Sequence, residues 1–290
     1  MGDYPDDLRE LVEDYLSGLA FSELDATAGL DRAMRYSLLA GGKRIRPVLC
    51  LAAARAAGTD PTDVLPAAAA IELIHTYSLI HDDLPAMDDD ELRRGRPTSH
   101  VAHGEDVAIL AGDGLFAEAI QLFCARQSGD PARVLAALGE LASATGVAGM
   151  VGGQYVDVTA GEGLDADGLR ELHSLKTGRL IAASVSVPLL LAGLSDAQMD
   201  PYGRFATELG VLFQIVDDIL DVTGSDEELG KPQGSDERHG KLTYVSLFGL
   251  ERARELAAES HAGARAALAE AEGETTDLEL VADFIRTRQA

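Results

Sequence analysis

An apolar segment is followed directly by an aspartate-rich stretch, HDDLPAMDDDELRRGRP, which runs from His81 to Pro97. The ten residues before it, IELIHTYSLI, are apolar enough to form a buried helix, so the first aspartates fall at its inner end. Buried carboxylates need cations or hydrogen-bond donors, and the dipole at a helix C-terminus disfavours them further. A bound divalent cation resolves both problems, and oxygen-only ligands suit Mg²⁺ with water and phosphate in its other positions. A solvated acidic turn is the alternative interpretation of this stretch alone.

A second aspartate cluster lies in another apolar segment, VLFQIVDDILD, from Val211 to Asp221. Asp217 and Asp221 are four residues apart and therefore share one face of a helix. Gln214 lies one turn before Asp217 on nearly the same face. Two aspartate pairs, each embedded in an apolar helix, are hard to explain by chance and indicate one metal site built from two segments.

A basic segment, GGKRIRP, covers residues 41–47 and gathers Lys43, Arg46 and a third cation at the start of an expected helix. A helix N-terminus beside basic side chains is a favourable place to bind an anion, although a plain basic loop would have the same composition. His75 lies two helical turns before Asp82 and faces the same way. A lone histidine in an apolar helix is more often a core residue, so both interpretations stay open at this point.

The whole chain, residues 1–290, is expected to fold as one all-α domain. It has no linker, composition break or internal repeat, and no segment is typical of a strand. Two cysteines are too few for a disulfide framework and indicate a reducing compartment. The acidic start, MGDYPDDLRE, is unlike a signal peptide, and the longest uncharged stretches fall short of a membrane span. We therefore expect a cytoplasmic protein without a membrane span.

The net charge of −25 argues against nucleic acid as a partner. The chain has few lysines, and every one of them falls in a distinct sequence motif: Lys43, Lys176, Lys231 and Lys241. An acidic surface this poor in lysine also fits a cytoplasm at high salt, where screening removes the repulsion between like charges. That a halophilic organism made this protein is a hypothesis from composition.

Three motifs in combination, DDLPAMD, LRRGRP and DDILD, resemble the aspartate-rich motifs of the short-chain trans-polyprenyl diphosphate synthases, the farnesyl and geranylgeranyl diphosphate synthase family. The resemblance extends from about Arg35 to the C-terminus and includes GGKRIRP and a KTG segment. It implies an isoprenoid synthase bundle of antiparallel helices around a central cavity, commonly as a homodimer. It also implies ionisation of an allylic diphosphate (dimethylallyl or geranyl), attack of isopentenyl diphosphate on the allylic cation, and loss of a proton.

The resemblance also assigns roles to individual residues. Mg²⁺ is held by Asp82, Asp88 and Asp217, with support from Asp83, Asp218 and Asp221. The allylic diphosphate is held by Arg93, Lys176, Thr177, Gln214, Lys231 and Lys241. Isopentenyl diphosphate is bound without metal by Lys43, Arg46, His75 and Arg94. The residues assigned to catalysis are Asp82, Asp88, Arg93, Lys176, Asp217 and Lys231.

Two further features depend on backbone geometry and loops. Pro85 must break or distort its helix, which would let Asp88 swing back toward Asp82. The glycine-rich segment 224–240 is expected to close lysines over a diphosphate. Gln154 and Asp157 resemble a family segment that lines the cavity.

Three other functions are compatible with parts of this pattern. A terpene cyclase would not need GGKRIRP, and a non-catalytic subunit of a heteromeric synthase usually lacks one aspartate motif. A head-to-head prenyl synthase would lack both GGKRIRP and LRRGRP. Because all of these motifs are present, we favour the chain-elongating enzyme.

Product length is expected to depend on Tyr77 and Ser78. Tyr77 lies five residues before Asp82, roughly 7–8 Å along a helix, and its ring is bulky enough to close a tunnel, whereas Ser78 is not. In the resembled family, an aromatic residue at this position together with the inserted Pro85-Ala86 accompanies a C15 product. We therefore expect farnesyl diphosphate, with geranylgeranyl diphosphate as the alternative. A Tyr77 ring packed in the core on the far side of its helix would have no such role.

Overall fold

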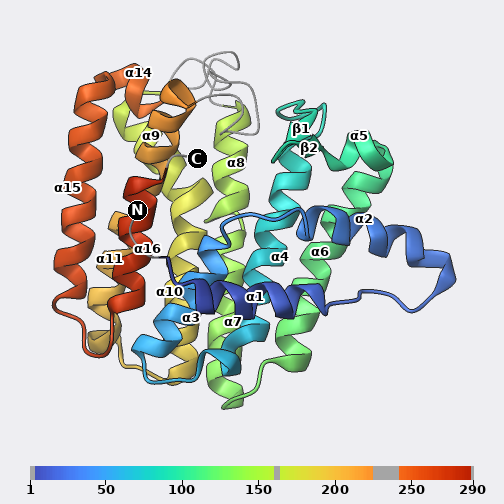
Figure 1. The fold of residues 1–290 in the computed structure, drawn as a ribbon, viewed down its shortest axis with the longest axis horizontal. Helices are drawn as coiled ribbons and strands as arrows, with labels where there is room; N and C mark the ends of the chain where they lie inside the picture. The colour runs from blue at the N-terminus through green and yellow to red at the C-terminus, as the bar shows by residue number, and fades with distance from the viewer. Residues whose placement is uncertain (1–3, 160–163, 225–241, 289–290) are drawn as a thin grey trace.

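The computed structural model describes residues 4–159, 164–224 and 242–288, which form a bundle of helices (Figure 1). The α-helices are α1 (Asp6–Ser17), α2 (Ala28–Leu38), α3 (Ile45–Ala56), α4 (Leu65–Asp82), α5 (Ser99–His103), α6 (Glu105–Arg126), α7 (Pro131–Thr145), α8 (Met150–Thr159), α9 (Ala166–His173), α10 (Arg179–Ala192), α11 (Asp196–Thr223), α14 (Tyr244–Phe248), α15 (Leu250–Leu268) and α16 (Thr276–Thr287). Shorter elements are two 3₁₀ turns (Asp25–Thr27 and Pro61–Val64), a π-helical turn (Ser174–Gly178) and the strands β1 (Leu92–Arg93) and β2 (Arg96–Pro97). The expected all-α class is confirmed.

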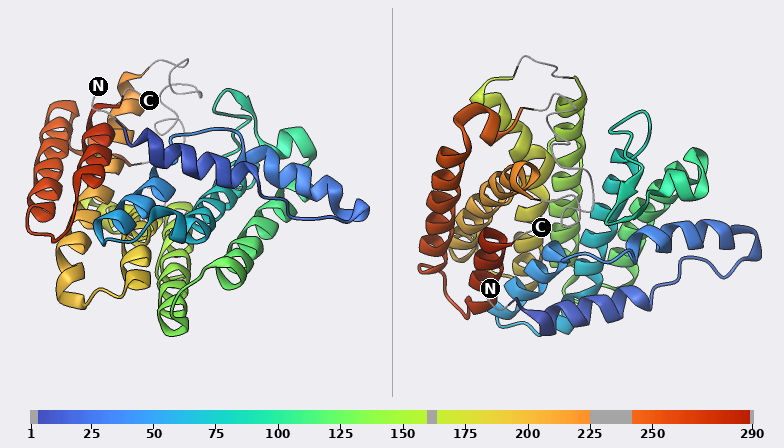
Figure 2. Two further views of the ribbon diagram at one scale, coloured as in Figure 1. Left: turned by 60° about the horizontal axis from the view of Figure 1, so that its bottom comes forward. Right: turned by 45° about the horizontal axis from the view of Figure 1, so that its top comes forward.

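Most of the long helices stand side by side, while α1 and α2 lie across them (Figures 1 and 2). α4 is apolar on every side, and most of its residues from Pro66 to Ile80 are buried, as expected for a helix surrounded by others. The C-terminal ends of α4 and α11 carry the two aspartate pairs, and both point to the upper end of the bundle in Figure 1. The fold therefore brings two acidic segments that are distant in sequence to one end of the molecule.

Two expected helices are each divided by glycine. The expected helix 131–160 is divided into α7 and α8 by an irregular turn at residues 146–149, which is so tight that a Cβ on Gly149 would lie 2.0 Å from the Ala144 carbonyl oxygen. The segment 242–270 forms α14 and α15, which are separated by Gly249 at φ 78°. This left-handed conformation favours glycine, so a helical sequence pattern continues across a real break.

The expectation of no strand is wrong at LRRGRP, where β1 and β2 form a two-residue antiparallel hairpin. Its turn residues, Arg94 and Gly95, have φ values of 54° and 70°. Two left-handed residues in a row match the twist of the flanking strands. Arginine is an unusual first residue for such a turn, which usually has Asn, Asp or Gly there, so the residue types at this turn do not predict a hairpin.

By length and apolar composition alone, four helical stretches of the described chain could cross a membrane: Pro61–Asp82, Glu105–Arg126, Pro131–Thr159 and Ala166–Ala192. The most apolar window of the first stretch is 67% buried inside the bundle, so much of its apolar surface already contacts protein. That the chain lacks a membrane span stays a prediction.

A buried ion pair fixes the basic segment 41–47 to the core. The Arg44 side chain, 1% exposed, donates to Glu72 at 2.7 Å, to Glu13 at 2.8 Å and to the Leu38 carbonyl at 2.7 Å. Glu72 lies within the apolar helix α4 and is 3% exposed at its side chain. Each of these buried charges needs the other, so Arg44 holds the segment in place and is not part of an anion site.

Replacing Arg44 with methionine should destabilise the fold by about 3–5 kcal/mol, because Glu72 would remain as an uncompensated buried charge. The free energy of unfolding, measured by urea titration, tests this. The matched control is Arg9→Ala, whose exposed partner Asp6 lies at 3.0 Å and whose loss should cost about 0–1 kcal/mol. Equal losses in the two variants would contradict the assignment, and Arg44→Met with Glu72→Leu should recover part of the stability.

Candidate active site

The first aspartate motif folds back on itself where α4 ends. The backbone N–H of Asp88 donates to the carbonyl of Asp82 at 2.9 Å, and the N–H of Asp89 donates to the carbonyl of Leu84 at 3.1 Å. Asp89 itself has φ 52°. Because Pro85 cannot continue the helix, the chain turns and returns Asp88 to Asp82, as the sequence predicted.

Asp83, the second residue of this motif, is held by a protein donor. Its side chain is 5% exposed, and Nε of Arg93 donates to both of its oxygens at 2.7 and 3.0 Å. Burial raises the pKa of the Asp83 carboxyl, and the bond from Arg93 offsets part of that rise. The resemblance implies that Arg93 holds the allylic diphosphate, whereas in the folded chain its guanidinium lies on Asp83.

The two adjacent aspartates of the second motif divide in the same way, and the third, Asp221, is buried. Asp218 is buried and accepts hydrogen bonds from the Gln214 side-chain amide at 2.9 Å and from the Tyr244 backbone N–H at 2.7 Å. Asp217 keeps 57% of its side chain exposed and forms an ion pair with Arg288 at 3.1 Å. In each motif, one carboxylate is bound within the protein and its neighbour remains accessible.

A cation cluster forms around the Phe213 ring, where the guanidinium carbons of Arg46 and Arg288 lie 5.7 and 4.4 Å from its centroid. Nη1 of Arg46 is also 3.3 Å from Nε2 of His75. The Nε atoms of Arg46 and Arg288 are buried and have no hydrogen-bond partner within the described part of the chain. Leaving buried donors unsatisfied is costly, so this cluster offers donors that an anion would satisfy.

Burial shifts the pKa values of the groups in this cluster. The pKa of Lys43 falls to about 8 because of burial and the nearby Arg288 cation, with a smaller opposing effect of Asp217. Burial also lowers the pKa of Arg46 to about 10. Burial, and after it the charge of Arg46, holds the pKa of His75 well below its usual value, so this ring is neutral at pH 7.

Arg94 docks the β1–β2 hairpin onto the basic segment. Its guanidinium donates to the carbonyl of Gly41, and a Cβ on Gly42 would lie 2.8 Å from that guanidinium. The charge of Arg94 acts on both Arg46 and His75. The residues predicted to bind isopentenyl diphosphate therefore come to one region from three segments: Lys43, Arg46, His75 and Arg94.

The KTG segment lies on the π-helical turn Ser174–Gly178, between two glycines of neighbouring helices. A Cβ on Gly153 of α8 would lie 2.2 Å from the backbone nitrogen of Lys176. A Cβ on Gly210 of α11 would lie 3.1 Å from the Cα of Gly178. The absence of side chains at these two positions lets α8 and α11 approach the turn from either side.

The side chains of Lys176 and Thr177 in this turn have partners on those helices. Nζ of Lys176 donates to Asp157 of α8 at 2.5 Å. The Thr177 hydroxyl donates to the side-chain oxygen of Gln214 at 3.4 Å, and Gln214 in turn donates to Asp218. The predicted allylic residues are thus linked to the second aspartate motif.

Two partly buried side chains near this turn carry buried polar atoms without a hydrogen-bond partner in the described part of the chain. Neither polar side-chain atom of Gln154 has a hydrogen-bond partner among the described residues, nor does Nδ1 of His173. Burial lowers the pKa of His173 to about 4, so its ring is neutral at pH 7. The sequence indicated Gln154 through its resemblance, whereas nothing marked His173.

Tyr77 is partly buried and packs against His81 of its own helix and Phe116 of α6. The Ser78 hydroxyl donates to the carbonyl of His75 at 2.9 Å and so is bonded to its own helix. Tyr77 is therefore not enclosed in the core, and its ring lies at the contact between α4 and α6.

The chemistry of the carboxylates suits Mg²⁺. Within residues 4–159, 164–224 and 242–288, no three His, Cys, Asp or Glu side chains form a group that could hold an ion. Asp82, Asp88 and Asp217 are nevertheless at least partly exposed at the same end of the bundle. Mg²⁺ commonly takes one or two protein carboxylates and fills its other positions with water and phosphate, so these aspartates fit ions that bind together with a diphosphate.

Some of the predicted site residues lie outside the described residues, namely Lys231, Lys241 and nearly all of the 224–240 segment. Two further residues of this region, Arg288 and Phe213, were not predicted from the sequence. Arg288 follows the last helix in a segment with no recognisable motif. An aromatic residue directly before Gln214 was the available signal for Phe213.

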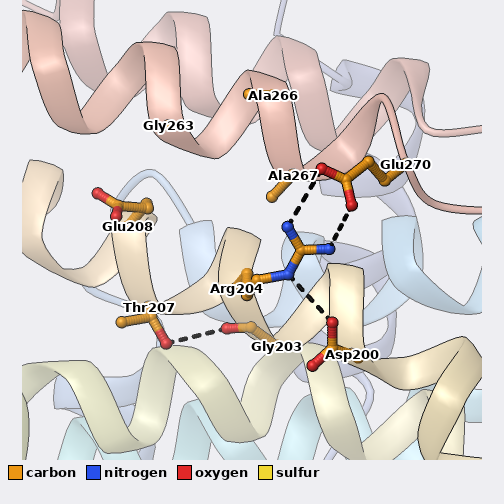
Figure 3. Close-up of a pocket in the computed structure, with 9 residues that line it drawn as sticks. All are labelled: Asp200, Gly203, Arg204, Thr207, Glu208, Gly263, Ala266, Ala267 and Glu270. Carbon is orange, nitrogen blue, oxygen red and sulfur yellow. Dashed lines mark hydrogen bonds and ion pairs between the residues drawn. The ribbon is translucent and has the colours of Figure 1, made fainter.

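A groove of about 560 Å³ lies between α11 and α15 and contains none of these site residues (Figure 3). Three of its charged side chains pair with one another: Arg204 bonds Glu270 at 2.7 Å and Asp200 at 3.1 Å. Gly203 and Gly263 widen it without adding a functional group. The groove therefore gives no candidate site.

Comparison with known proteins identifies relatives over most of the chain. A family model described as polyprenyl synthetase matches residues 27–279. A heterodimeric geranylgeranyl pyrophosphate synthase large subunit 1, chloroplastic, from Arabidopsis thaliana is 51% identical over 81% of this chain and 66% of its own length. A chloroplastic geranylgeranyl pyrophosphate synthase from Capsicum annuum is 49% identical over 79% of this chain and 63% of its own length. The chain thus spans slightly less than two thirds of these relatives.

Solved structures share the fold over nearly the whole chain. A geranyltransferase from Legionella pneumophila has a TM-score of 0.87 and 34% identity, covering 98% of this chain and 95% of that one. A geranyltransferase from Helicobacter pylori, complexed with magnesium and isoprenyl diphosphate, has a TM-score of 0.86 and 32% identity, covering 97% of this chain and 94% of that one.

The cytoplasmic location expected from the sequence is contradicted by these curated relatives, which are named as chloroplastic. The high-salt hypothesis is not tested by these comparisons. Because the matched region runs from residue 27 to 279 and solved relatives share the same bundle, the chain belongs to the polyprenyl synthetase family.

Proposed function

We propose that the chain is a short-chain trans-prenyltransferase that condenses isopentenyl diphosphate with an allylic diphosphate. The observation that carries this proposal is the presence of two aspartate motifs at one end of the bundle together with a separate cluster of buried cations around Phe213. Accessible carboxylates suit a metal-bound diphosphate, and unsatisfied guanidinium donors suit a second diphosphate without metal. A terpene cyclase would have no use for the second site.

The allylic diphosphate is proposed to lie between the two aspartate motifs. Mg²⁺ bound by Asp82, Asp88 and Asp217 would neutralise the charge that develops on the leaving diphosphate. Lys176 and Thr177 donate to the same diphosphate from the π-helical turn. Lys231 and Lys241 retain this role by resemblance alone. Arg93 is better described as a residue that positions Asp83, because its guanidinium lies on that carboxylate.

Isopentenyl diphosphate is proposed to bind in the cation cluster. Lys43, Arg46 and Arg94 hold its diphosphate, and Arg288 joins them through its buried, unsatisfied Nε. His75 is neutral, so it accepts or donates a hydrogen bond without adding charge. The proton lost after condensation passes to the released diphosphate.

Geranylgeranyl diphosphate is the proposed main product. The expectation of farnesyl diphosphate rested on the bulk of Tyr77, but several relatives are named geranylgeranyl pyrophosphate synthases. Sizing the products formed from labelled isopentenyl diphosphate and each allylic primer tests this. A C15 product as the main one would restore the farnesyl assignment.

A homodimer stays a prediction, and a heteromeric assembly is the alternative, because one relative is named as the large subunit of a heterodimeric synthase. The presence of both aspartate motifs supports a catalytic chain in either assembly. The molar mass of the purified chain in solution distinguishes a homodimer from a monomer that needs a different partner.

Activity should require Mg²⁺, and Asp82→Ala and Asp217→Ala should each reduce kcat/KM by about 10²–10³-fold or more, because charge on the leaving group would lose its main stabilisation. Steady-state kinetics with and without a chelator test this, with circular dichroism to verify folding. Asp113→Ala is the matched control, since that aspartate on α6 keeps 64% of its side chain exposed. Turnover near the wild-type rate in either site variant would contradict the metal assignment.

Affinity for isopentenyl diphosphate should fall as pH rises through about 8. The pKa of Lys43 is about 8, so Lys43 is charged below that pH and neutral above it, and the charged form attracts the diphosphate. The pH profile of kcat/KM for isopentenyl diphosphate reports the pKa values of the free enzyme. In Lys43→Arg the fall should move to higher pH, and an unchanged midpoint in that variant would assign the fall to another group.

Replacing Gly153 with alanine should raise KM for the allylic diphosphate by about 10–100-fold, because the new Cβ would displace the turn that carries Lys176. KM for isopentenyl diphosphate should change little. The matched control is Gly139→Ala on α7, where a Cβ meets nothing within 4 Å. Equal changes in the two KM values would show that the turn does not belong to the allylic subsite.

A further inference from the structure

Three aromatic rings contact one another in series, edge to face, where α4 contacts α6: His81, Tyr77 and Phe116. They lie on the side of the bundle away from α15 (Figure 1). The Tyr77 ring lies edge-on to Phe116, with centroids 5.4 Å apart and planes at 77°. The same ring is edge-on to His81, at 5.8 Å and 77°. His81 fits beside α6 because residue 112 of that helix is glycine: a Cβ on Gly112 would lie 2.2 Å from Nε2 of His81.

The three rings lie at defined distances from the aspartates along the two helices. α6 runs back beside α4, away from the end that carries Asp82 (Figure 1). His81 and Gly112 therefore form the upper level. Tyr77, four residues before His81 on α4, and Phe116, four residues after Gly112 on α6, form the level below. At 1.5 Å per residue, four residues separate the two levels by about 6 Å.

We propose that Phe116 is a second chain-length-determining residue, which forms with Tyr77 a two-ring floor that stops the growing isoprenoid chain. This inference rests on the proposed prenyltransferase function. An edge-to-face contact favours one relative orientation of the two rings. This contact opposes rotation of either ring away from the growing isoprenoid chain. Tyr77 supplies the α4 half of the floor, and Phe116 supplies the α6 half.

The burial of Phe116 indicates what its removal would do. Phe116 is 39% exposed in the single chain. On the α6 side, its ring alone therefore separates the floor from solvent. The residue one turn before it on the same face is Gly112, and Ala119 follows within the next turn. Neither of these two residues has a side chain large enough to replace the lost ring, so the space that the ring leaves would be open to the surface of α6.

The test is the product distribution from labelled isopentenyl diphosphate and geranyl diphosphate, compared between wild type and Phe116→Ala. The ratio of products longer than the wild-type main product to that product should rise by about tenfold or more, because pockets discriminate single methylenes by factors of that order. Phe116→Tyr should keep the wild-type distribution because the ring remains. Leu110→Ala is the matched control, as Leu110 is exposed on the same helix.

The possible outcomes separate the two proposals. If wild type does not elongate the primer, the proposed function fails. If wild type and Phe116→Ala both elongate with the same distribution, the function stands and Phe116 is not part of the floor. A change in molar mass in solution with no change in distribution assigns Phe116 to a surface contact and also overturns the inference. If Phe116→Ala does not fold, Phe116→Leu gives the same comparison with a smaller cavity.

Discussion

In each aspartate motif, one carboxylate of the adjacent pair is buried against protein donors, and the geometry of the candidate site depends on those bonds. Asp83 receives Arg93 from the β1–β2 hairpin, and Asp218 receives the backbone N–H of Tyr244 at the start of α14. Burying these carboxylates would be costly without such partners. Because both donors come from elements outside the helix that carries the acid, each bond fixes a surrounding element as well as the motif. The accessible aspartates beside them are thereby held in a defined position.

The helices and acidic motifs could be predicted from sequence because they depend on local pattern. An apolar run predicts a buried helix, and Pro85 predicts the turn that returns Asp88 to Asp82. The β1–β2 hairpin could not be predicted, because Arg94 adopts a left-handed conformation that its residue type does not signal. Its conformation goes with its contact to the carbonyl of Gly41, 53 residues away in sequence.

The sequence predicted which residues belong to the candidate site better than it predicted their contacts. Lys43, Arg46 and His75 could be named because they stand in or beside a motif, but the partner of Arg93 could not be inferred from spacing. Arg288 was missed because its contacts to Asp217 and Phe213 join the end of the chain to a helix more than seventy residues earlier. The cluster that results gathers cations whose donors are partly unsatisfied. A ligand that binds this folded form alone would therefore stabilise the whole chain.

The π-helical turn sets the rotation of α9 relative to α10, and the positions of Lys176 and Thr177 depend on that rotation. A π-helical turn bonds i to i+5 and so contains one residue more than an α-helical path between the same ends. Removing one residue from Ser174–Gly178 would rotate α9 against α10 by about 100°. Lys176 and Thr177 could then no longer face Asp157 and Gln214 together. A one-residue deletion that preserves every named side chain could therefore abolish the subsite, so in this segment the length of the chain carries as much information as its residues.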